Sequence, residues 1–292
     1  MLETPGGILA VSFQPILRFA PSPNGPLHLG HAYSALFTWQ AATLLGGVAL
    51  LRIEDIDIDR SKPEFDAAIQ ADLAWLGLDW PEPVMRQSQR FPAYEQAANA
   101  LRRLDIVYPC FCSRADIAAR SSAGDPDGAP LYPGTCRHLP ADEAETRLAR
   151  GDAVQYRLDM GKATAMTGSL TYSVIGPTVL DRPQIRYARP ERWGDFVLQR
   201  KGTPTSYHLS VVVDDAAQHI THVTRGRDME ASTDIHVLLQ FLLNLDTPYY
   251  SFHRLILDAE GRKLSKSKGS PSLASLRDAG WTPQDVRTYL GF

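Results

Sequence analysis

Two histidines stand three positions apart in a segment rich in proline and glycine near the start of the chain. The segment reads RFAPSPNGPLHLGH from Arg18 to His31, and apolar residues at helical spacing follow it. Amides and the dipole at a helix start favour phosphate groups, and the imidazoles of His28 and His31 could stabilise charge that develops there. Gly30 lets a flat ring approach the backbone. A capping loop with two incidental histidines explains this segment equally well when it is taken alone.

A second charged loop lies near the other end of the chain. Residues 263–269 read KLSKSKG, with three lysines and two serines. Such a loop can close on a triphosphate and neutralise charge in a phosphoryl-type transition state. A lysine-rich loop is more often only a solvated segment, so it points to a nucleotide site only together with the histidine segment.

The chain contains three cysteines, and all of them lie between residues 110 and 136. An odd number of clustered cysteines in a chain without an export signal indicates a metal site rather than disulfides. Three thiolates need a fourth donor for tetrahedral zinc, and on chemistry alone His138 is the better candidate. We expect a structural ion, because no open position or general base is found beside the cysteines. Three buried free thiols are the alternative.

Length and composition bound the class of protein. Of 292 residues, 44% are apolar and 22% are charged. These values exclude a disordered or fibrous protein and allow one large domain or two modest ones. No apolar run approaches the roughly 20 residues of a membrane helix. Residues 1–15 lack the features of an export signal, so we expect a cytoplasmic protein without a membrane span.

The charge balance limits contact with nucleic acid. Thirty basic and 33 acidic residues give a net charge of −3, which excludes attraction over the whole surface but permits a local basic face. One stretch mixes cations with aromatic rings and could contact RNA, although a solvated surface is equally good as an explanation. This stretch contains Arg182, Arg186, Tyr187, Arg189, Arg192, Trp193, Arg200 and Lys201.

A strand–loop–helix–strand order positions the histidine segment. An apolar segment ending at Arg18 enters the proline-rich loop, a helix is expected over 30–45, and a nearly continuous apolar strand over 48–53. This βαβ unit places the loop at the carboxyl end of its first strand, where doubly wound sheets form binding crevices. An acidic run beginning at Glu54 follows the second strand. The sequence predicts an α/β protein with a Rossmann-like doubly wound parallel sheet.

The rest of the chain divides into an insertion, a continuation of the α/β body and a short helical tail. Short strand-like pieces such as 154–158, with proline and glycine between them, indicate an inserted subdomain that carries the cysteines. Helices are expected at 63–76, 94–104 and 232–245, a strand at 252–257, and α/β-type segments of unassigned kind at 196–200, 207–214 and 219–224. The expected divisions are a leader (1–15), the first half of the α/β domain (16–107), the insertion (108–190), the second half (191–257) and the lysine loop with two short helices (258–292).

Together, the histidine and lysine segments resemble the two signatures of class I aminoacyl-tRNA synthetases. Those signatures are usually written HIGH and KMSKS, and this chain has HLGH and KLSKS. The text RFAPSPNGPLHLGH, RIEDID and YHLSVVVDD, followed by Arg225 and Gly226, is similar to glutamyl-tRNA synthetases over residues 16–270. Only 25 residues follow Ser267. The chain therefore resembles the shorter glutamyl-Q tRNA(Asp) synthetase branch of that family, and no anticodon-binding domain is expected.

The resemblance implies roles for residues in both segments. His28 and His31 would meet the phosphates of ATP, and Lys266 would hold the departing pyrophosphate. Gly30 and Lys263 complete the implied nucleotide site, with Mg²⁺ as the counter-ion of ATP.

The resemblance also implies a site for L-glutamate. A dicarboxylic amino acid needs cationic forks for its carboxylates, here Arg18 and Arg225, and an acid for its ammonium group. Glu54 would be that acid, although the neighbouring Asp55 could face inward instead. The complete implied glutamate site is Arg18, Ala20, Ser22, Glu54, Tyr207 and Arg225.

For the cysteines, the resemblance favours Tyr132 over His138 as the fourth zinc ligand. The pattern of the shorter branch is Cys-x-Cys followed by Tyr-x-x-x-Cys, which this chain meets. The implied zinc ligands are Cys110, Cys112, Tyr132 and Cys136.

The activity implied by the resemblance is a two-step ligase reaction. Glutamate is activated by ATP to glutamyl-adenylate and is then transferred to the queuosine base in the anticodon of tRNA(Asp), by a protein expected to be a monomer. Two alternatives remain open: a shortened glutamyl-tRNA synthetase that charges the 3′ end of tRNA(Glu), and a catalytically silent zinc-bearing module that binds RNA.

Overall fold

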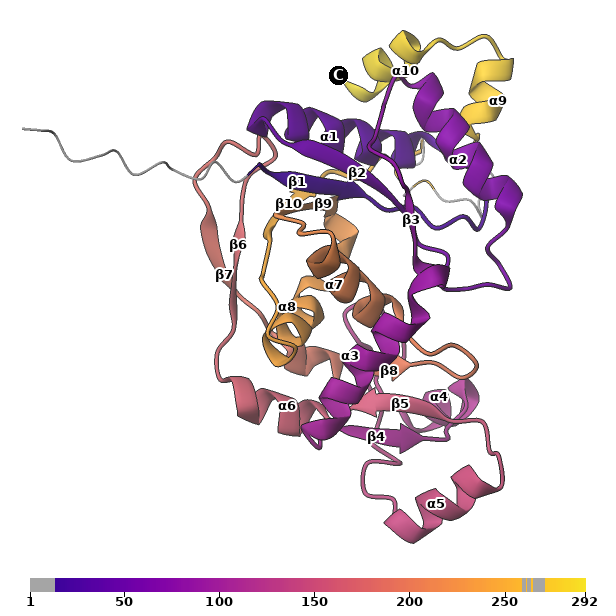
Figure 1. The fold of residues 1–292 in the computed structure, drawn as a ribbon, viewed down its shortest axis with the longest axis vertical. Coiled ribbons are helices and arrows are strands. Elements are labelled where there is room, and N and C mark those ends of the chain that lie inside the picture. The colour runs from indigo at the N-terminus through magenta and orange to yellow at the C-terminus, as the bar shows by residue number, and fades with distance from the viewer. Residues whose placement is uncertain (1–13, 259–260, 262–263, 265–270) are drawn as a thin grey trace, which may run out of the picture.

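The computed structural model describes residues 14–258, 261, 264 and 271–292, and its centre is formed by two adjoining sheets (Figure 1). The first is parallel with the strand order β1–β2–β3, and the second has the order β7–β6–β10–β9. Their strands are β1 (Ile16–Phe19), β2 (Val48–Ile53), β3 (Met85–Arg86), β6 (Thr171–Val174), β7 (Gln184–Tyr187), β9 (His222–Gly226) and β10 (Tyr249–His253).

The two sheets meet where β1 lies beside β9. The amide of Thr221 donates to the carbonyl oxygen of Ile16 at 2.9 Å. β9 pairs in parallel with β10, and β1 pairs in parallel with β2. The strands β3, β2, β1, β9 and β10 thus follow one another in space. This arrangement confirms the predicted Rossmann-like α/β body.

Helices cover both faces of this body. Helix α1 (Leu29–Leu45) packs on one face, and α7 (Tyr207–Ala217) and α8 (Thr233–Leu242) lie on the other (Figure 1). Gly46 ends α1 with a φ of 65°, a left-handed conformation that glycine adopts without strain. The remaining helices of the body are α2 (Pro63–Trp75) and α3 (Phe91–Arg103), together with the 3₁₀ turns η1 (Gln87–Arg90), η2 (Pro190–Trp193) and η3 (Arg227–Met229).

Two segments differ in detail from the sequence-based expectations. The unassigned segment 207–214 belongs to α7, whose buried face includes Leu209, Val212 and Asp215. The strand expected at 252–257 overlaps β10 only at residues 252 and 253, because β10 pairs with β9 from Tyr249 onwards and ends at His253.

The insertion forms a separate antiparallel sheet with the order β4–β5–β8. Its strands are β4 (Val107–Cys110), β5 (Gln155–Leu158) and β8 (Val197–Gln199), and its helices are α4 (Arg114–Arg120), α5 (Ala141–Ala149) and α6 (Met160–Thr167). The boundary of the insertion expected at residue 190 does not separate the two sheets, because strands on either side of it belong to the other sheet. β6 and β7 join β10 in the central sheet, where Tyr172 and Val174 enter its core, whereas β8 pairs with β5.

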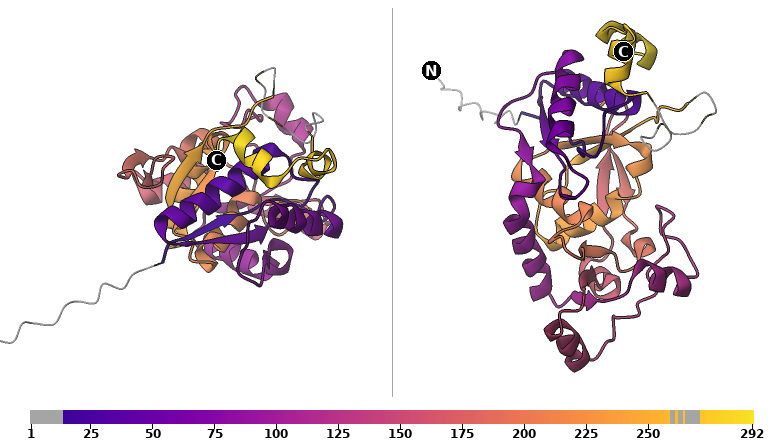
Figure 2. Two further views of the ribbon diagram at one scale, coloured as in Figure 1. Left: turned by 90° about the horizontal axis from the view of Figure 1, so that it is seen from above. Right: turned by 90° about the vertical axis from the view of Figure 1, so that its right-hand side faces the viewer.

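The chain ends in two short capped helices, α9 (Leu273–Asp278) and α10 (Pro283–Leu290), at the end of the molecule opposite the insertion (Figure 2). Val286 and Leu290 bury their side chains in the core cluster that also contains Leu36 and Leu73. Among the described residues, no helix combines the length and the apolar character needed to cross a membrane.

Candidate active site

A cavity of about 710 Å³ opens at the carboxyl ends of β1, β2, β9 and β10. It is lined by every described residue that the sequence assigned to glutamate or ATP, namely Arg18, Ala20, Ser22, His28, Gly30, His31, Glu54, Tyr207 and Arg225. Lys263 and Lys266 lie outside the described residues. Their neighbour Leu264 lines the same cavity, so segments from both ends of the chain meet there.

His28 and His31 are held together at the start of α1. His28 Nδ1 accepts from the Gly30 amide at 3.1 Å, and His31 Nδ1 accepts from the His28 amide at 3.2 Å. The ring centroids are 3.9 Å apart. Because each Nδ1 accepts a hydrogen bond, each neutral imidazole carries its proton on Nε2. A Cβ atom on Gly30 would lie 2.9 Å from Cε1 of His28, so this ring needs glycine there.

A buried charge network forms one wall of the cavity. Arg18 donates to Asp215 through Nε at 2.9 Å and through Nη2 at 3.3 Å. Arg52, which has no exposed surface, donates to Asp215 at 2.8 Å and to Glu54 at 3.2 Å. Although burial opposes ionisation, the two guanidinium groups lower the pKa of Asp215 below its usual value. Two largely buried arginines therefore share two largely buried carboxylates.

Glu54 faces the cavity, whereas Asp55 does not line it. The carboxylate of Asp55 accepts from the amide and hydroxyl of Ser88, at 2.8 and 2.6 Å, and so caps η1. Burial raises the pKa of Glu54, and the charges of Arg52 and Arg18 oppose that rise. Of the two acids left open by the sequence, Glu54 is the one that a ligand in the cavity would meet.

Arg225, at the carboxyl end of β9, is a buried cation without an anionic partner among the described residues. Its Nη1 contacts Nδ1 of His236 at 3.1 Å, and its Nη2 donates to the hydroxyl of Thr233. The guanidinium carbon lies 5.2 Å from the ring centre of Tyr250. Its Nε is buried without a hydrogen-bond partner. A guanidinium whose hydrogen-bond partners are neutral, and which lines a cavity, is suited to bind an anion.

The cavity also contains residues that the sequence analysis missed. His253 ends β10 and contacts the Ser34 hydroxyl through Nε2 at 3.1 Å, and Arg254 follows it. The signal that could have found them is their place at the end of a parallel strand, the edge where such sheets bind ligands. The other lining residues are Phe19, Pro21, Asn24, Ser34, Arg60, Thr224, Gly226, Asp228, Met229, Leu255, Ile256 and Leu264.

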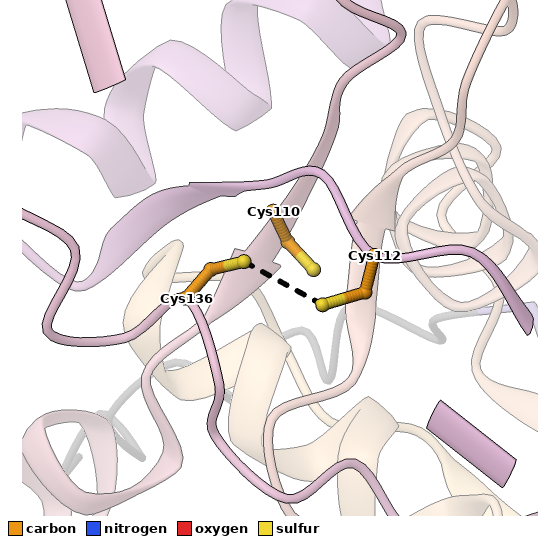
Figure 3. Close-up of side chains that lie close together, drawn as sticks. All are labelled: Cys110, Cys112 and Cys136. Carbon is orange, nitrogen blue, oxygen red and sulfur yellow. Dashed lines mark hydrogen bonds between the residues drawn. The ribbon is translucent and has the colours of Figure 1, made fainter. Parts of the chain in front are cut away.

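The three cysteines converge in the insertion (Figure 3), and their sulfur atoms lie within 4.8 Å of one another. Cys112 Sγ is 3.6 Å from Cys136 Sγ. Burial raises the pKa of the Cys110 thiol, but hydrogen bonds with Tyr132 and Gln155 outweigh it and lower that pKa to about 7. Burial and the neighbouring Cys136 raise the pKa of Cys112 to about 11. Three thiols at this spacing could hold one metal ion, which would favour all three thiolates.

Tyr132, and not His138, stands beside these sulfur atoms. The Tyr132 hydroxyl lies 3.4 Å from Cys110 Sγ and accepts from the Cys136 amide at 2.7 Å. The Arg157 guanidinium carbon lies 3.9 Å from the centre of the Tyr132 ring. His138 is exposed and is not part of the cluster. The chemical preference for histidine as fourth donor therefore has no support in the geometry, and an oxygen donor lies nearby instead.

Much of the basic stretch between residues 182 and 201 makes contacts within the protein. Arg186 pairs with Glu230, and Arg192 pairs with Asp234 at 2.7 Å. Lys201 donates to the carbonyl oxygens of Phe111 and Cys112, and Trp193 is buried. Tyr187, on the edge strand β7, is 71% exposed. Contact of this stretch with RNA stays a prediction.

Comparison with known proteins identifies the family to which the sequence is similar. A sequence model of the family described as tRNA synthetases class I (E and Q), catalytic domain, matches residues 16–291. The chain is 45% identical over 287 residues to a protein from Rhodobacter capsulatus named Glutamyl-Q tRNA(Asp) synthetase, with 94% of this chain and 99% of that protein covered.

Longer proteins match as well. The chain is 38% identical over 282 residues to a Glutamate–tRNA ligase of a Synechococcus species, with 94% of this chain and 57% of that protein covered. A crystal structure of a glutamate tRNA ligase from Elizabethkingia meningosepticum in complex with its amino acid superimposes with a TM-score of 0.74 and 26% identity over 96% of this chain and 61% of the other. The chain thus spans less than two thirds of these ligases. Because the family model covers residues 16–291 and the relative from Rhodobacter capsulatus is 45% identical over 94% of this chain, the chain belongs to the family of class I tRNA synthetases (E and Q), through their catalytic domain.

Proposed function

We propose that the chain uses ATP to activate L-glutamate as glutamyl-adenylate and transfers the glutamyl group to the queuosine base in the anticodon of tRNA(Asp). One observation carries the first half of this proposal. Arg225 is a buried cation in the cavity without a carboxylate partner among the described residues, and it shares that cavity with Glu54 and the histidine pair. An amino acid with a second carboxylate supplies the anion that this arginine needs.

In the proposed binding mode, each charge of glutamate has a partner. The α-carboxylate is the group that reacts, so the side-chain carboxylate is assigned to Arg225. Arg18 lines the same cavity and uses Nε and Nη2 on Asp215, so the α-carboxylate is assigned to its remaining nitrogen, Nη1. Glu54 takes the ammonium group, and Tyr207 and Ser22 complete the wall.

The proposed chemistry needs no covalent intermediate on the protein. The α-carboxylate attacks the α-phosphorus of ATP, a new acyl–phosphate bond forms, and the bond to the β-phosphate oxygen breaks with release of pyrophosphate. His28 and His31 donate from Nε2 to phosphate oxygens at the start of α1, where the helix dipole also favours negative charge. Lys266 would neutralise the leaving pyrophosphate, and Mg²⁺ would accompany the nucleotide.

The choice of acceptor rests on relatives and not on the cavity. The relative covered over 99% of its own length carries the name Glutamyl-Q tRNA(Asp) synthetase. A second candidate, aminoacylation of the 3′ end of tRNA(Glu), is favoured by the 38% identity to a Glutamate–tRNA ligase. In the proposed reaction, a hydroxyl of the queuosine cyclopentenediol attacks the adenylate carbonyl and releases AMP.

The cysteine cluster would hold one structural zinc ion. Cys110, Cys112 and Cys136 supply three sulfur donors, and Tyr132 supplies an oxygen as the fourth. Such an ion would tie β4 to the loop that carries Cys136. It lies in the insertion, and none of the four donors lines the cavity.

A transfer assay tests the proposal. The protein is incubated with ATP, labelled glutamate and one of three RNAs: tRNA(Asp) with queuosine, tRNA(Asp) without it, or tRNA(Glu). Label that appears only on the anticodon of queuosine-containing tRNA(Asp) supports the proposal. Label on a 3′-terminal adenosine supports the second candidate, and RNA binding without label on any RNA supports the catalytically silent module.

A further inference from the structure

We propose that His236 is a positioning residue for Arg225: with Thr233 it fixes the plane of the guanidinium group, and His208 behind it fixes its tautomer. The inference rests on the proposed function for the identity of the ligand. The network itself is a property of β9, α7 and α8.

The first step is the way in which Arg225 is held. Thr233 and His236 are three residues apart on α8, so both face the same side of the helix. Both are almost fully buried, and each contacts one terminal nitrogen of the guanidinium group. Asp234, the carboxylate between them, pairs with Arg192 instead, at 2.7 Å. The arginine is thus oriented by two neutral acceptors while its charge remains available to a ligand.

The second step is the direction of the hydrogen bonds. An arginine only donates, so Nδ1 of His236 accepts and carries no proton. The proton of the neutral ring is then on Nε2, which lies 3.3 Å from Nδ1 of His208. His208 accepts there and carries its own proton on its Nε2. The hydrogen bonds from Arg225 to His236 and from His236 to His208 therefore run in the same direction, with each histidine accepting at Nδ1 and carrying its proton on Nε2.

The surroundings keep His236 neutral. Burial, followed by the positive charge of Arg225, holds the pKa of His236 well below its usual value. An imidazolium at this place would offer no acceptor and would repel the guanidinium. The ring of Tyr207 packs 5.7 Å from that of His236, centre to centre, and connects the network to the cavity wall.

The arrangement selects for the charge of the ligand. If a carboxylate held Arg225, it would neutralise the arginine and compete with the carboxylate of the amino acid. A neutral histidine and a threonine orient the fork without this competition. The network therefore favours an amino acid with a side-chain carboxylate over its amide analogue, and loosening it weakens that preference.

Paired variants test the role of His236 in glutamate-dependent pyrophosphate exchange. His236→Leu removes the acceptor, and His236→Asn keeps an oxygen near the position of Nδ1. We expect His236→Leu to raise the KM for glutamate by about tenfold or more with little change in the KM for ATP or in kcat, and His236→Asn to recover most of the loss. Thr233→Val, which removes the hydroxyl, should likewise raise the KM for glutamate, and Thr233→Ser, which keeps the hydroxyl, should recover most of that loss. His222→Asn is the matched control: it changes a histidine at the start of β9, the strand that carries Arg225, and should leave the KM for glutamate unchanged.

A second measurement does not depend on activity. In the ¹⁵N-histidine-labelled protein, the nitrogen shifts of His236 and His208 should report a protonated Nε2 and an unprotonated Nδ1 in both rings. An unchanged glutamate KM in His236→Leu, or a proton on Nδ1 of His236, overturns the inference. If the wild-type protein shows no glutamate-dependent exchange either with or without queuosine-containing tRNA(Asp), the proposed function fails, and the tautomers alone then decide whether the network exists.

Discussion

Arg18 and Asp215 are joined by two hydrogen bonds across 197 residues of sequence, and the same carboxylate also binds Arg52. Asp215 thereby fixes one wall of the cavity from the end of α7. Both guanidinium groups are buried, so they depend on this acid and on Glu54 for counter-charge.

Removal of the Asp215 charge should destabilise the protein strongly. In Asp215→Asn, two buried cations would share one remaining carboxylate, and breaking a buried ion pair costs about 3 to 5 kcal/mol. Urea denaturation should show this loss in the free energy of unfolding. Asp152→Asn, at an exposed ion pair with Arg150, is the control and should change it far less. Equal effects of the two substitutions would contradict the role given to Asp215.

Glutamate binding should weaken at acidic pH because of Glu54. Its pKa is raised by burial, and an ammonium group beside it would favour the ionised form. As the pH falls through this raised pKa, Glu54 gains a proton and loses its attraction for the ligand, so the KM for glutamate should rise. The measurement is the glutamate KM in pyrophosphate exchange as a function of pH.

Substitution of Glu54 should remove this dependence. Glu54→Gln should have a high KM for glutamate that no longer changes over that pH range, whereas Asp55→Asn should keep the wild-type pH profile. A profile that follows Asp55 instead would reverse the assignment of the two acids.

The cysteine cluster should hold one zinc ion per chain. Elemental analysis of metal-replete protein should find this stoichiometry, and Cys136→Ser should lose it. In competition with a chelator, Tyr132→Phe should release zinc more readily than the wild type, whereas His138→Ala should not, because His138 lies outside the cluster. Metal-free protein with three freely titratable thiols would exclude the site.

Lys266 should act on the nucleotide and not on the fold. Lys266→Ala should strongly lower glutamate-dependent pyrophosphate exchange, because the leaving group would lose a counter-charge. Its unfolding transition should match that of the wild type. Lys162→Ala, at an exposed pair with Asp105, is the control for loss of a lysine. Normal exchange in Lys266→Ala would remove this lysine from the mechanism.

Local patterns in the sequence predicted the part of the fold that frames the site. The helix expected at 30–45 and the strand at 48–53 are α1 and β2, because apolar periodicity and the Gly46–Gly47 stop are local signals. The nine described residues that the sequence and the resemblance assigned to glutamate or ATP all line one cavity. Here the resemblance supplied residues, such as Tyr207, that no local pattern marks.

Contacts between distant segments could not be predicted in this way. The pairing of Arg52 with Asp215 spans 163 residues, and the contact between His208 and His236 joins two helices whose packing follows only from the complete fold. For the same reason, the sequence could not predict to which sheet each strand near the insertion belongs. β6 belongs to the central sheet because it pairs with β10, and β7 belongs to it because it pairs with β6; a composition shift near residue 190 does not reveal these partners.

The most direct test of the central claim is pyrophosphate exchange by the wild type and Arg225→Ala, measured over a range of glutamate concentrations with and without queuosine-containing tRNA(Asp). The account predicts that the wild type incorporates labelled pyrophosphate into ATP only when glutamate is present, and that Arg225→Ala needs much more glutamate for the same rate. Exchange that ignores glutamate, or an Arg225→Ala protein with the wild-type glutamate requirement, would contradict the claim that this cavity activates the amino acid.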